Sequence, residues 1–364
     1  MTQSTTLVKN GWYQGAWSDE IGRTLMQRWI VGRPVCFYRL RDGSVTALED
    51  RCPHRKFPLS LGRLDPDADV VTCDYHGYRI GGDGQCVGVA EQSDTPRASV
   101  HRFPIVERDG IVWIWPGDPE LADPADIPDT SWLSDPDWTY VRGMVPLKAR
   151  HLLLVENLLD LTHETFLHPS SIGNAAVAST PIDVTAEGNH VSFTRHMTGI
   201  AAPPFYEKSM GLTSPIDRWQ DGEFYAPGVF KLDIRLAPTG TEEPEGFHMK
   251  VLYGMTPATE YETHDFFALA RDYRVDDEEL SRFQLRQQLA VMKEDVDALE
   301  VQEHMVATES GGPPESSIRS DVAGLRGRRL LERMAAREAR AATGATVAGR
   351  QPRHTPRPAG VTGT

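Results

Sequence analysis

The 364-residue sequence has no long apolar run, no excess of positive charge and few cysteines. Its net charge of −14 leaves it without the basic surface that nucleic acids and anionic membranes attract. No stretch approaches the roughly 20 apolar residues of a membrane-spanning helix, and the N-terminal segment lacks the apolar centre of a signal peptide. We therefore expect a cytoplasmic protein that binds neither nucleic acid nor membrane.

The four cysteines are Cys36, Cys52, Cys73 and Cys86. In a reducing cytosol an even number does not imply disulfides, and cysteines with a function there are more often metal ligands or catalytic groups. Cys52 and Cys73 each have a histidine at a spacing suited to metal binding. Cys36 and Cys86 do not, so we expect these two to be packed in or near a core.

Short strand-like runs and turn signals dominate the first third of the chain. Residues 26–48 and the hairpin pattern around Asp109-Gly110 predict a small β domain. The Pro- and Asp-rich stretch 116–129 is typical of a linker. We therefore place an all-β domain over residues 1–125.

The pattern changes after the linker. Alternating polar and apolar residues over 181–270 predict antiparallel strands. Helical spacing is found over residues 151–168, 276–305 and 321–342. These patterns predict a second domain over 126–342 and an α+β fold class for the chain. The segment 343–364 has almost no large apolar groups, and we expect it to be a disordered tail.

Two short motifs in the first domain each combine a cysteine with a histidine. Cys52-Pro-His54 is followed, after eighteen residues, by Cys73-x-x-His76. Each motif lies beside Pro or Gly, as two opposed loops holding a cluster require. In a Rieske centre one iron binds two thiolates and the other binds two imidazoles. The motifs therefore predict a Rieske [2Fe–2S] cluster, with a tetrahedral zinc site as the alternative.

Because a Rieske cluster only transfers electrons, a second site is needed to use them. The helical stretch 151–168 offers His163 and His168, but five residues on an ideal helix rotate by roughly 140°. Both can bind one metal only if the helix bulges or ends between them, and Pro169 disfavours helix there. Non-haem Fe(II) oxygenases use two histidines and one carboxylate. We expect this pair to supply the two histidines, the alternative being surface histidines near a helix end.

The carboxylate ligand is expected from the stretch 276–305. On a helical wheel, its apolar stripe is formed by Leu285, Leu289, Met292, Val296 and Leu299. Asp295 lies roughly 60° from the centre of that stripe. A carboxylate aimed partly into a core needs a partner, and a metal ion is one. We predict Asp295 as the ligand and Glu300 as the second choice, with Glu294 and Asp297 pointing to solvent.

Two other acidic residues flank the first histidine. Asp160, three residues before His163, either is solvated or accepts a hydrogen bond from a histidine N–H. Glu164 is expected to be a solvated helix carboxylate.

Several segments resemble the oxygenase components of Rieske non-haem iron oxygenases, from about residue 10 to about residue 340. CPHRKFPLSLG and CDYHG are general to that family. The later segments are similar to the vanillate O-demethylase group: NLLDLTHETFLHPSSIG, RHMTGIAAPPF, PIDRWQ and KEDVDALEVQE. One departure is Tyr78, which lies beside the cluster where many relatives have Trp.

The resemblance implies roles for individual residues. It implies that His163, His168 and Asp295 hold the iron and that Asn157 lies near it without being a firm ligand. It also implies a head-to-tail homotrimer, in which Asp160 links a Rieske histidine of one subunit to His163 of its neighbour. The catalytic domain would have a helix-grip fold, with an antiparallel sheet wrapped on a long helix.

The resemblance implies O₂-dependent O-demethylation of a methoxylated aromatic acid such as vanillate, with release of formaldehyde. The chain has no nucleotide-binding glycine motif and no second cluster motif, so a separate flavin and iron–sulfur reductase would supply electrons from NAD(P)H. Hydroxylation of another aromatic or alicyclic acid, as in phthalate dioxygenase-like relatives, is the alternative reaction. A ferredoxin-like electron carrier and a two-zinc structural protein are alternatives from other classes.

A methoxybenzoate substrate is anionic and needs a cation or amide donors. Arg195 and Arg218 lie in the family-like segments, and Phe205 and Trp219 are candidates to pack on an aromatic ring. Each has an ordinary alternative, namely a salt-bridged arginine or a core aromatic residue.

Overall fold

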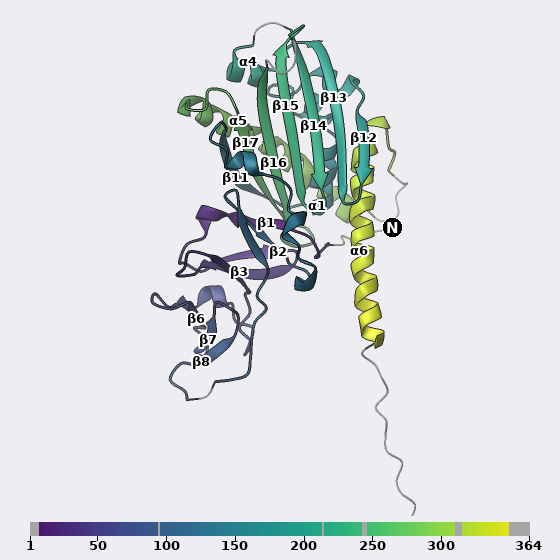
Figure 1. Ribbon diagram of the computed structural model, residues 1–364. Helices are drawn as coiled ribbons and strands as arrows, with labels where there is room; N and C mark the ends of the chain where they lie inside the picture. The colour runs from purple at the N-terminus through teal and green to yellow at the C-terminus, as the bar shows by residue number, and fades with distance from the viewer. Residues whose placement is uncertain (1–6, 94, 213–214, 242–245, 310–314, 349–364) are drawn as a thin grey trace, which may run out of the picture.

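The computed structural model describes residues 7–93, 95–212, 215–241, 246–309 and 315–348. A small β part lies at one end of a large sheet, and helices cover that sheet (Figure 1). None of the helices among the described residues is long and apolar enough to cross a membrane.

The small β part contains three antiparallel sheets. One sheet joins β1 (Tyr13–Trp17), β10 (Ile111–Ile114) and β9 (Ile105–Arg108). Another joins β2 (Met26–Ile30), β3 (Arg33–Arg39) and β4 (Val45–Glu49). The third joins β5 (Arg63–Leu64), β6 (Val70–Thr72), β7 (Tyr78–Gly81) and β8 (Cys86–Val89). The predicted hairpin at Asp109-Gly110 is confirmed, since both residues have the positive φ that a tight hairpin turn favours.

The stretch predicted as a linker contains only short 3₁₀ turns between the last small sheet and the large one. These turns are η3 (Pro119–Leu121) and η4 (Pro124–Asp126), and a third turn, η5 (Ser131–Leu133), follows the stretch. Two further 3₁₀ turns, η1 (Ser18–Glu20) and η2 (Leu59–Leu61), lie earlier in the chain, and η6 (Arg319–Asp321) precedes the last helix.

The large sheet has seven antiparallel strands in the order β11-β17-β16-β15-β14-β13-β12. Its strands are β11 (Thr139–Leu147), β12 (Asp183–Glu187), β13 (His190–Ile200), β14 (Ile216–Tyr225), β15 (Val229–Pro238), β16 (Phe247–Pro257) and β17 (Thr263–Arg271). Strand β11, which pairs with β17, was not predicted, because it precedes the predicted strand region 181–270. The antiparallel sheet itself is confirmed.

The single helix predicted over 151–168 is wrong, because the chain forms two helices there. These are α1 (His151–Leu159) and α2 (His163–Leu167). Asp160 ends α1, and its carboxylate accepts hydrogen bonds from the N–H and hydroxyl of Thr162 at 2.9 and 2.7 Å. This local capping of the backbone explains why α1 stops before the first histidine.

Four other helices lie among the described residues: α3 (Ala175–Ser179), α4 (Pro204–Met210), α5 (Glu278–Thr308) and α6 (Val322–Ala348). The long α5 contacts β11 and β17, and α6 packs on α1 and beside β12 and β13 (Figure 1). Helix α6 continues through Thr343, where we expected a disordered tail to begin. Residues 349–364 of that expected tail lie outside the described residues.

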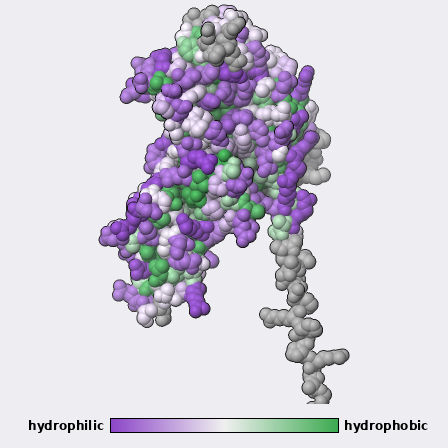
Figure 2. Space-filling view, viewed as in Figure 1, coloured by the Kyte–Doolittle hydropathy of each residue, from purple (hydrophilic) through white to green (hydrophobic). Residues whose placement is uncertain are grey.

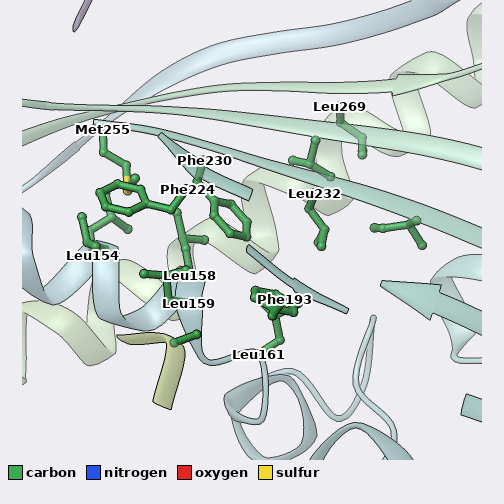
Figure 3. Packing of buried hydrophobic residues seen from close by; sticks show 14 of the residues in the cluster. Leu154, Leu158, Leu159, Leu161, Phe193, Phe224, Phe230, Leu232, Met255 and Leu269 are labelled. Atoms are coloured by element: carbon green, nitrogen blue, oxygen red, sulfur yellow. The ribbon is translucent and has the colours of Figure 1, made fainter. Parts of the chain in front are cut away.

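The main core lies between the large sheet and α1. Figure 3 shows leucines of α1, among them Leu154 and Leu158, packed against Phe224, Phe230 and Met255 from the sheet. Burying such side chains stabilises the fold by about 1.5–3 kcal/mol each. This packing fixes the end of α1, next to which the predicted iron ligands lie.

A second core joins the small β part to the large sheet. Trp12, Trp17 and Trp113 pack in one cluster with Leu252 and Phe266 of the large sheet. Backbone bonds add to this contact, and one of them runs from the Val31 N–H to the Pro257 carbonyl at 2.6 Å. The two parts of one chain therefore share an apolar interface.

Candidate metal centres

The two cysteine–histidine motifs form loops with the same backbone hydrogen bonds. In the first loop the Cys52 N–H donates to Phe57 at 2.8 Å, and the Lys56 N–H donates back to Cys52 at 2.9 Å. The second loop repeats both bonds, at 2.8 and 2.9 Å, among Cys73, Gly77 and Tyr78. The loops are therefore a matched pair, as an opposed grip on one cluster requires.

Burial separates the two kinds of side chain in these loops. Cys52 and Cys73 are buried, whereas His54 and His76 are exposed with their ring centroids 4.5 Å apart. Tyr78 stacks on the His54 ring at 4.9 Å, with 8° between the planes. The thiols thus lie on the inner side of the site and the imidazoles on its outer side.

The four side chains pair by chemical type. The side chains of Cys52 and Cys73 contact each other at the buried end of the site, and the rings of His54 and His76 lie together at the exposed end. In a Rieske centre one iron binds two thiolates and the other binds two imidazoles, so this donor set fits a [2Fe–2S] cluster.

A second group of ligands lies under the large sheet. His163 is the first residue of α2, His168 directly follows its end, and Asp295 comes from α5. Their ligand atoms all lie within 4.8 Å of one another. Nε2 of His163 and Nε2 of His168 lie 3.5 and 3.2 Å from Oδ1 of Asp295. Because α2 ends at Leu167, between the two histidines, both can face one point.

The outer nitrogen of each ring is held by an acceptor. Nδ1 of His163 lies 2.7 Å from the Asp160 carbonyl, and Nδ1 of His168 lies 2.6 Å from the Glu294 carboxylate. Because both partners only accept, each Nδ1 donates, and Nε2 of the neutral ring carries a lone pair. Two lone pairs then face the Asp295 carboxylate oxygen, and a bound cation resolves this conflict.

Two predictions about α5 are wrong. Glu294 was expected to point to solvent, yet it contacts His168 and its side chain is only 39% exposed. Leu289 was expected in the buried stripe and is 43% exposed. Met292 and Leu299 of the predicted stripe are buried, and Gln288 and Val291 lie on the buried side with them. The buried side of α5 was predicted from its apolar residues alone, whereas the side that faces the site is partly polar.

Other polar groups surround Asp295. The Asn157 amide donates to its Oδ1 at 3.2 Å. Burial lowers the pKa of His168, but the carboxylates of Asp295 and Glu294 outweigh that effect and raise it above its ordinary value. Burial and the charge of Asp295 together raise the pKa of Asp265 well above its ordinary value. The site is thus electronegative, which favours a cation.

Glu300 was the second choice for the carboxylate ligand. Its side chain instead accepts a hydrogen bond from the Lys148 N–H.

A cavity of about 60 Å³ adjoins the three ligands. Most of its lining is apolar, and Phe205 contributes to it. A cavity that holds a benzene ring measures about 150 Å³, so the lining side chains must move apart when an aromatic ring enters. The polar lining residues other than the three ligands are Glu164, Tyr206, Arg218, Tyr253, Gln287 and Gln288.

The expectation that Glu164 is solvated is wrong. Glu164 is buried and pairs with Arg218, which is 0% exposed. Arg195 is also buried, outside the cavity lining, and Trp219 lies on the outer face of the sheet, stacked on His196. Strand alternation was the missed signal, because it places Arg218 on the core face together with Ile216 and Phe224 and turns Trp219 outward.

Comparisons with known proteins agree with this geometry. The Rieske [2Fe-2S] domain family matches residues 11–104, and the vanillate O-demethylase oxygenase C-terminal domain family matches residues 147–337. The chain is 34% identical over 353 residues to the vanillate O-demethylase oxygenase subunit of Pseudomonas sp., which covers 93% of this chain and 98% of that protein.

Two further relatives extend this likeness. The toluene-4-sulfonate monooxygenase system iron-sulfur subunit of Comamonas testosteroni is 34% identical, over 90% of this chain and 96% of that protein. The crystal structure of dicamba monooxygenase with non-heme iron and dicamba superposes with a TM-score of 0.80 at 32% identity, over 92% of this chain and 99% of that one. The chain therefore belongs to the Rieske non-haem iron oxygenases and is the oxygenase component of a Rieske monooxygenase, with a [2Fe–2S] cluster and a non-haem iron as its cofactors.

Proposed function

We propose that this oxygenase O-demethylates a methoxylated aromatic acid such as vanillate. The observation that carries the proposal is the mostly apolar cavity, which is bordered by His163, His168 and Asp295 and includes one buried arginine, Arg218. Apolar walls suit an aromatic ring, and a fixed cation suits an acid group. The names of the vanillate and dicamba O-demethylase relatives support the same reaction class.

The reaction consumes O₂, two electrons and two protons. One oxygen atom is inserted into a C–H bond of the methoxy group, and the other leaves as water. The resulting hemiacetal breaks its bond between the methyl-derived carbon and the aryl oxygen, which gives a phenol and formaldehyde. A separate flavin and iron–sulfur reductase in the cytoplasm is the proposed source of the electrons, taken from NAD(P)H.

The residues divide between two metal sites in this proposal. Cys52, Cys73 and the two motif histidines would hold the [2Fe–2S] cluster, and His163, His168 and Asp295 would hold the iron. When bound, the cluster supplies single electrons and the iron activates dioxygen. Asp160 and Glu294 keep the two iron-site imidazoles in the tautomer that leaves Nε2 free.

We also propose a homotrimer in which one subunit's cluster loops lie near the next subunit's iron site. An open recess of about 620 Å³ beside His163 contains acidic side chains, including Asp160 and Glu315. The first cluster loop exposes basic side chains, Arg55 and Lys56, next to its outward-facing histidine. Opposite charges on the two surfaces favour their contact.

Exposed apolar groups accompany the charges on both surfaces. Tyr75, in the second cluster loop, is 59% exposed, and Phe166, on α2, is 77% exposed. Figure 2 shows apolar surface gathered mainly over the lower, small β part of the face in view. Exposed aromatic groups are typical of protein interfaces, which supports docking between subunits.

Product analysis tests the proposed reaction. The cluster- and iron-loaded protein, with a surrogate reductase and NADH, is supplied with a panel of methoxybenzoates under air. Equimolar formaldehyde and phenol are expected from at least one of them. A product that gains hydroxyl groups and keeps its methoxy group would instead show ring hydroxylation.

Subunit complementation tests the trimer. C73S and D295A subunits are each expected to be inactive, one through its cluster and the other through its iron site. In randomly mixed trimers about a quarter of cluster-to-iron junctions between subunits are intact, so about a quarter of the wild-type rate should return. If electrons passed from cluster to iron within one subunit, the mixed trimers would recover no activity.

A further inference from the structure

A continuous chain of buried polar side chains connects the cavity wall to α2. Arg195 donates to Gln220 at 3.1 Å, and Gln220 donates to Glu164 at 2.9 Å. Glu164 accepts from Arg218 at 3.1 Å. Arg218 also donates to the Tyr206 hydroxyl at 2.9 Å and lies over its ring at 4.8 Å. Because Glu164 directly follows His163, this chain links the cavity wall to the helix that carries the proposed iron ligands.

The charges in this network do not balance. Two guanidinium groups, of Arg195 and Arg218, are buried around one carboxylate, that of Glu164. The carboxylate of Asp160 acts on Arg195 from a distance but is hydrogen-bonded to Thr162. Burying an unpaired charge is costly, so this network, which has one guanidinium more than it has carboxylates, calls for an anionic partner.

Unused hydrogen-bond donors support the same conclusion. Within the part of the chain that the structure describes, Nε of Arg195 and Nε of Arg218 have no hydrogen-bond partner. Arg218 is itself part of the cavity lining, together with the aromatic ring of Phe205. Its other contact is the carbonyl of Ile172, at 3.2 Å. A guanidinium that is fixed by several partners and retains a free donor is suited to binding an oxyanion.

We propose that Arg218 binds the carboxylate or sulfonate of the aromatic substrate. Tyr206 and Glu164 are positioning residues that hold its guanidinium, and Arg195 adds a second positive charge to the same network. This inference rests on the proposed function only for the identity of the substrate as an aromatic ether. It assigns Arg218 the task of anchoring the acid group while the other end of the ring lies near the iron ligands.

Binding of charged and neutral ligands of similar shape tests the proposal. The probes are 4-methoxybenzoate, 4-methoxybenzenesulfonate and the neutral 4-methoxybenzamide, titrated calorimetrically into the anaerobic, fully loaded enzyme. The wild type should bind at least one anion more tightly than the amide, and comparison of the two anions identifies the preferred acid group. R218Q should raise the Kd of that anion about 10–100-fold and that of the amide less than about 3-fold, because a charged hydrogen bond is lost.

Two further variants separate recognition from support of the fold. R218K should recover part of the anion affinity, since it restores the charge without the planar fork. Y206F should weaken anion binding about 3–10-fold and leave amide binding unchanged, because the guanidinium loses one fixed partner. R235Q is the matched control, because Arg235 lies on the neighbouring strand and pairs with Asp221 on the outer face.

Equal weakening of anion and amide binding in R218Q would overturn the proposal and leave Arg218 a structural role. Wild-type enzyme that binds the amide as tightly as both anions, or binds neither anion, would also overturn it. If R218Q does not fold, the R218K and Y206F ratios of anion to amide affinity decide the matter. Formaldehyde release is scored separately, so tight anion binding without formaldehyde contradicts the proposed reaction and not the role of Arg218.

Discussion

The two proposed metal sites of this chain are built in opposite ways. The cluster ligands lie within residues 52–76, on two loops that are closed by their own backbone hydrogen bonds. The iron ligands come from α2 and α5, and His168 and Asp295 are 127 residues apart in sequence. The first site depends on local turn geometry, whereas the second depends on packing of the whole catalytic part.

The two sites also differ in exposure. The histidines of the cluster loops face outward, and His168 is buried beneath the sheet. Electrons need a route to a partner, which favours exposed ligands on the cluster. Oxygen chemistry needs water kept away from the reacting atoms, which favours a buried site. The structure thus separates electron delivery from the reaction by placing them on different scaffolds.

Removing one ligand from each site should give the largest effects and separate them most clearly. D295A should lose the iron and all but about a thousandth of the turnover, because one of three ligands is gone, yet keep the reduced-cluster EPR signal. C73S should lose that signal and still bind one iron per chain. Metal analysis and EPR of both proteins measure the outcome.

D297A is the control for these variants, because Asp297 lies on the same helix and pairs with Lys293 at the exposed surface. It should match the wild type in both measurements. Loss of the cluster signal in D295A would contradict the independence of the two sites.

D160N tests whether the two sites communicate through Asp160. The asparagine keeps an oxygen that accepts the Thr162 hydrogen bonds but loses the negative charge. Both metals should remain bound, and reoxidation of the reduced cluster by O₂ and substrate should slow about 10–100-fold. Stopped-flow absorbance follows this reoxidation. D183N, on the exposed edge strand, should have no effect, and a normal rate in D160N would remove Asp160 from the path.

E294Q tests the outer support of the iron site with a smaller effect. Glu294 holds the His168 ring from the side away from Asp295. An amide in its place weakens that hold, so the Kd for Fe(II) should rise about 10-fold. Competition with a chromophoric chelator measures it, and D297N serves as the control. If E294Q and D297N bind Fe(II) equally well, the contact has no supporting role.

The same contrast explains what the sequence predicted. The four cluster ligands were predicted from spacing alone, because local loops leave a local signature. His163, His168 and Asp295 were also predicted, and the structure brings them together. Iron binding by His163, His168 and Asp295 stays a prediction. Cluster binding by the four motif residues also stays a prediction.

Residues whose surroundings come from distant strands were predicted badly. Glu164 was expected to be a solvated helix carboxylate because nothing in its own segment indicates Arg218, which approaches it from β14. Glu294 was misplaced because its partner, His168, lies outside its own helix. In both cases a charged residue is buried by a contact remote in sequence, which periodicity within one segment does not encode.

The smallest expected effect concerns the match between the two cluster loops. Lys56 and Gly77 occupy the same place in their loops, with φ of 63° and 71°. A residue with a side chain pays about 1 kcal/mol for that conformation, and glycine does not. K56G should therefore raise the free energy of unfolding by up to about 1 kcal/mol, whereas G77A should lower it, because the added Cβ would also meet Ala90 at 3.1 Å. Denaturant titration, followed through bleaching of the cluster, measures both.

K56Q is the control, because it removes the charge and keeps the backbone strain. It should therefore match the wild type in its free energy of unfolding. If K56Q were stabilised as much as K56G, charge repulsion with Arg55 rather than backbone strain would be the cause, and the two loops would be alike in hydrogen bonding but not in energy.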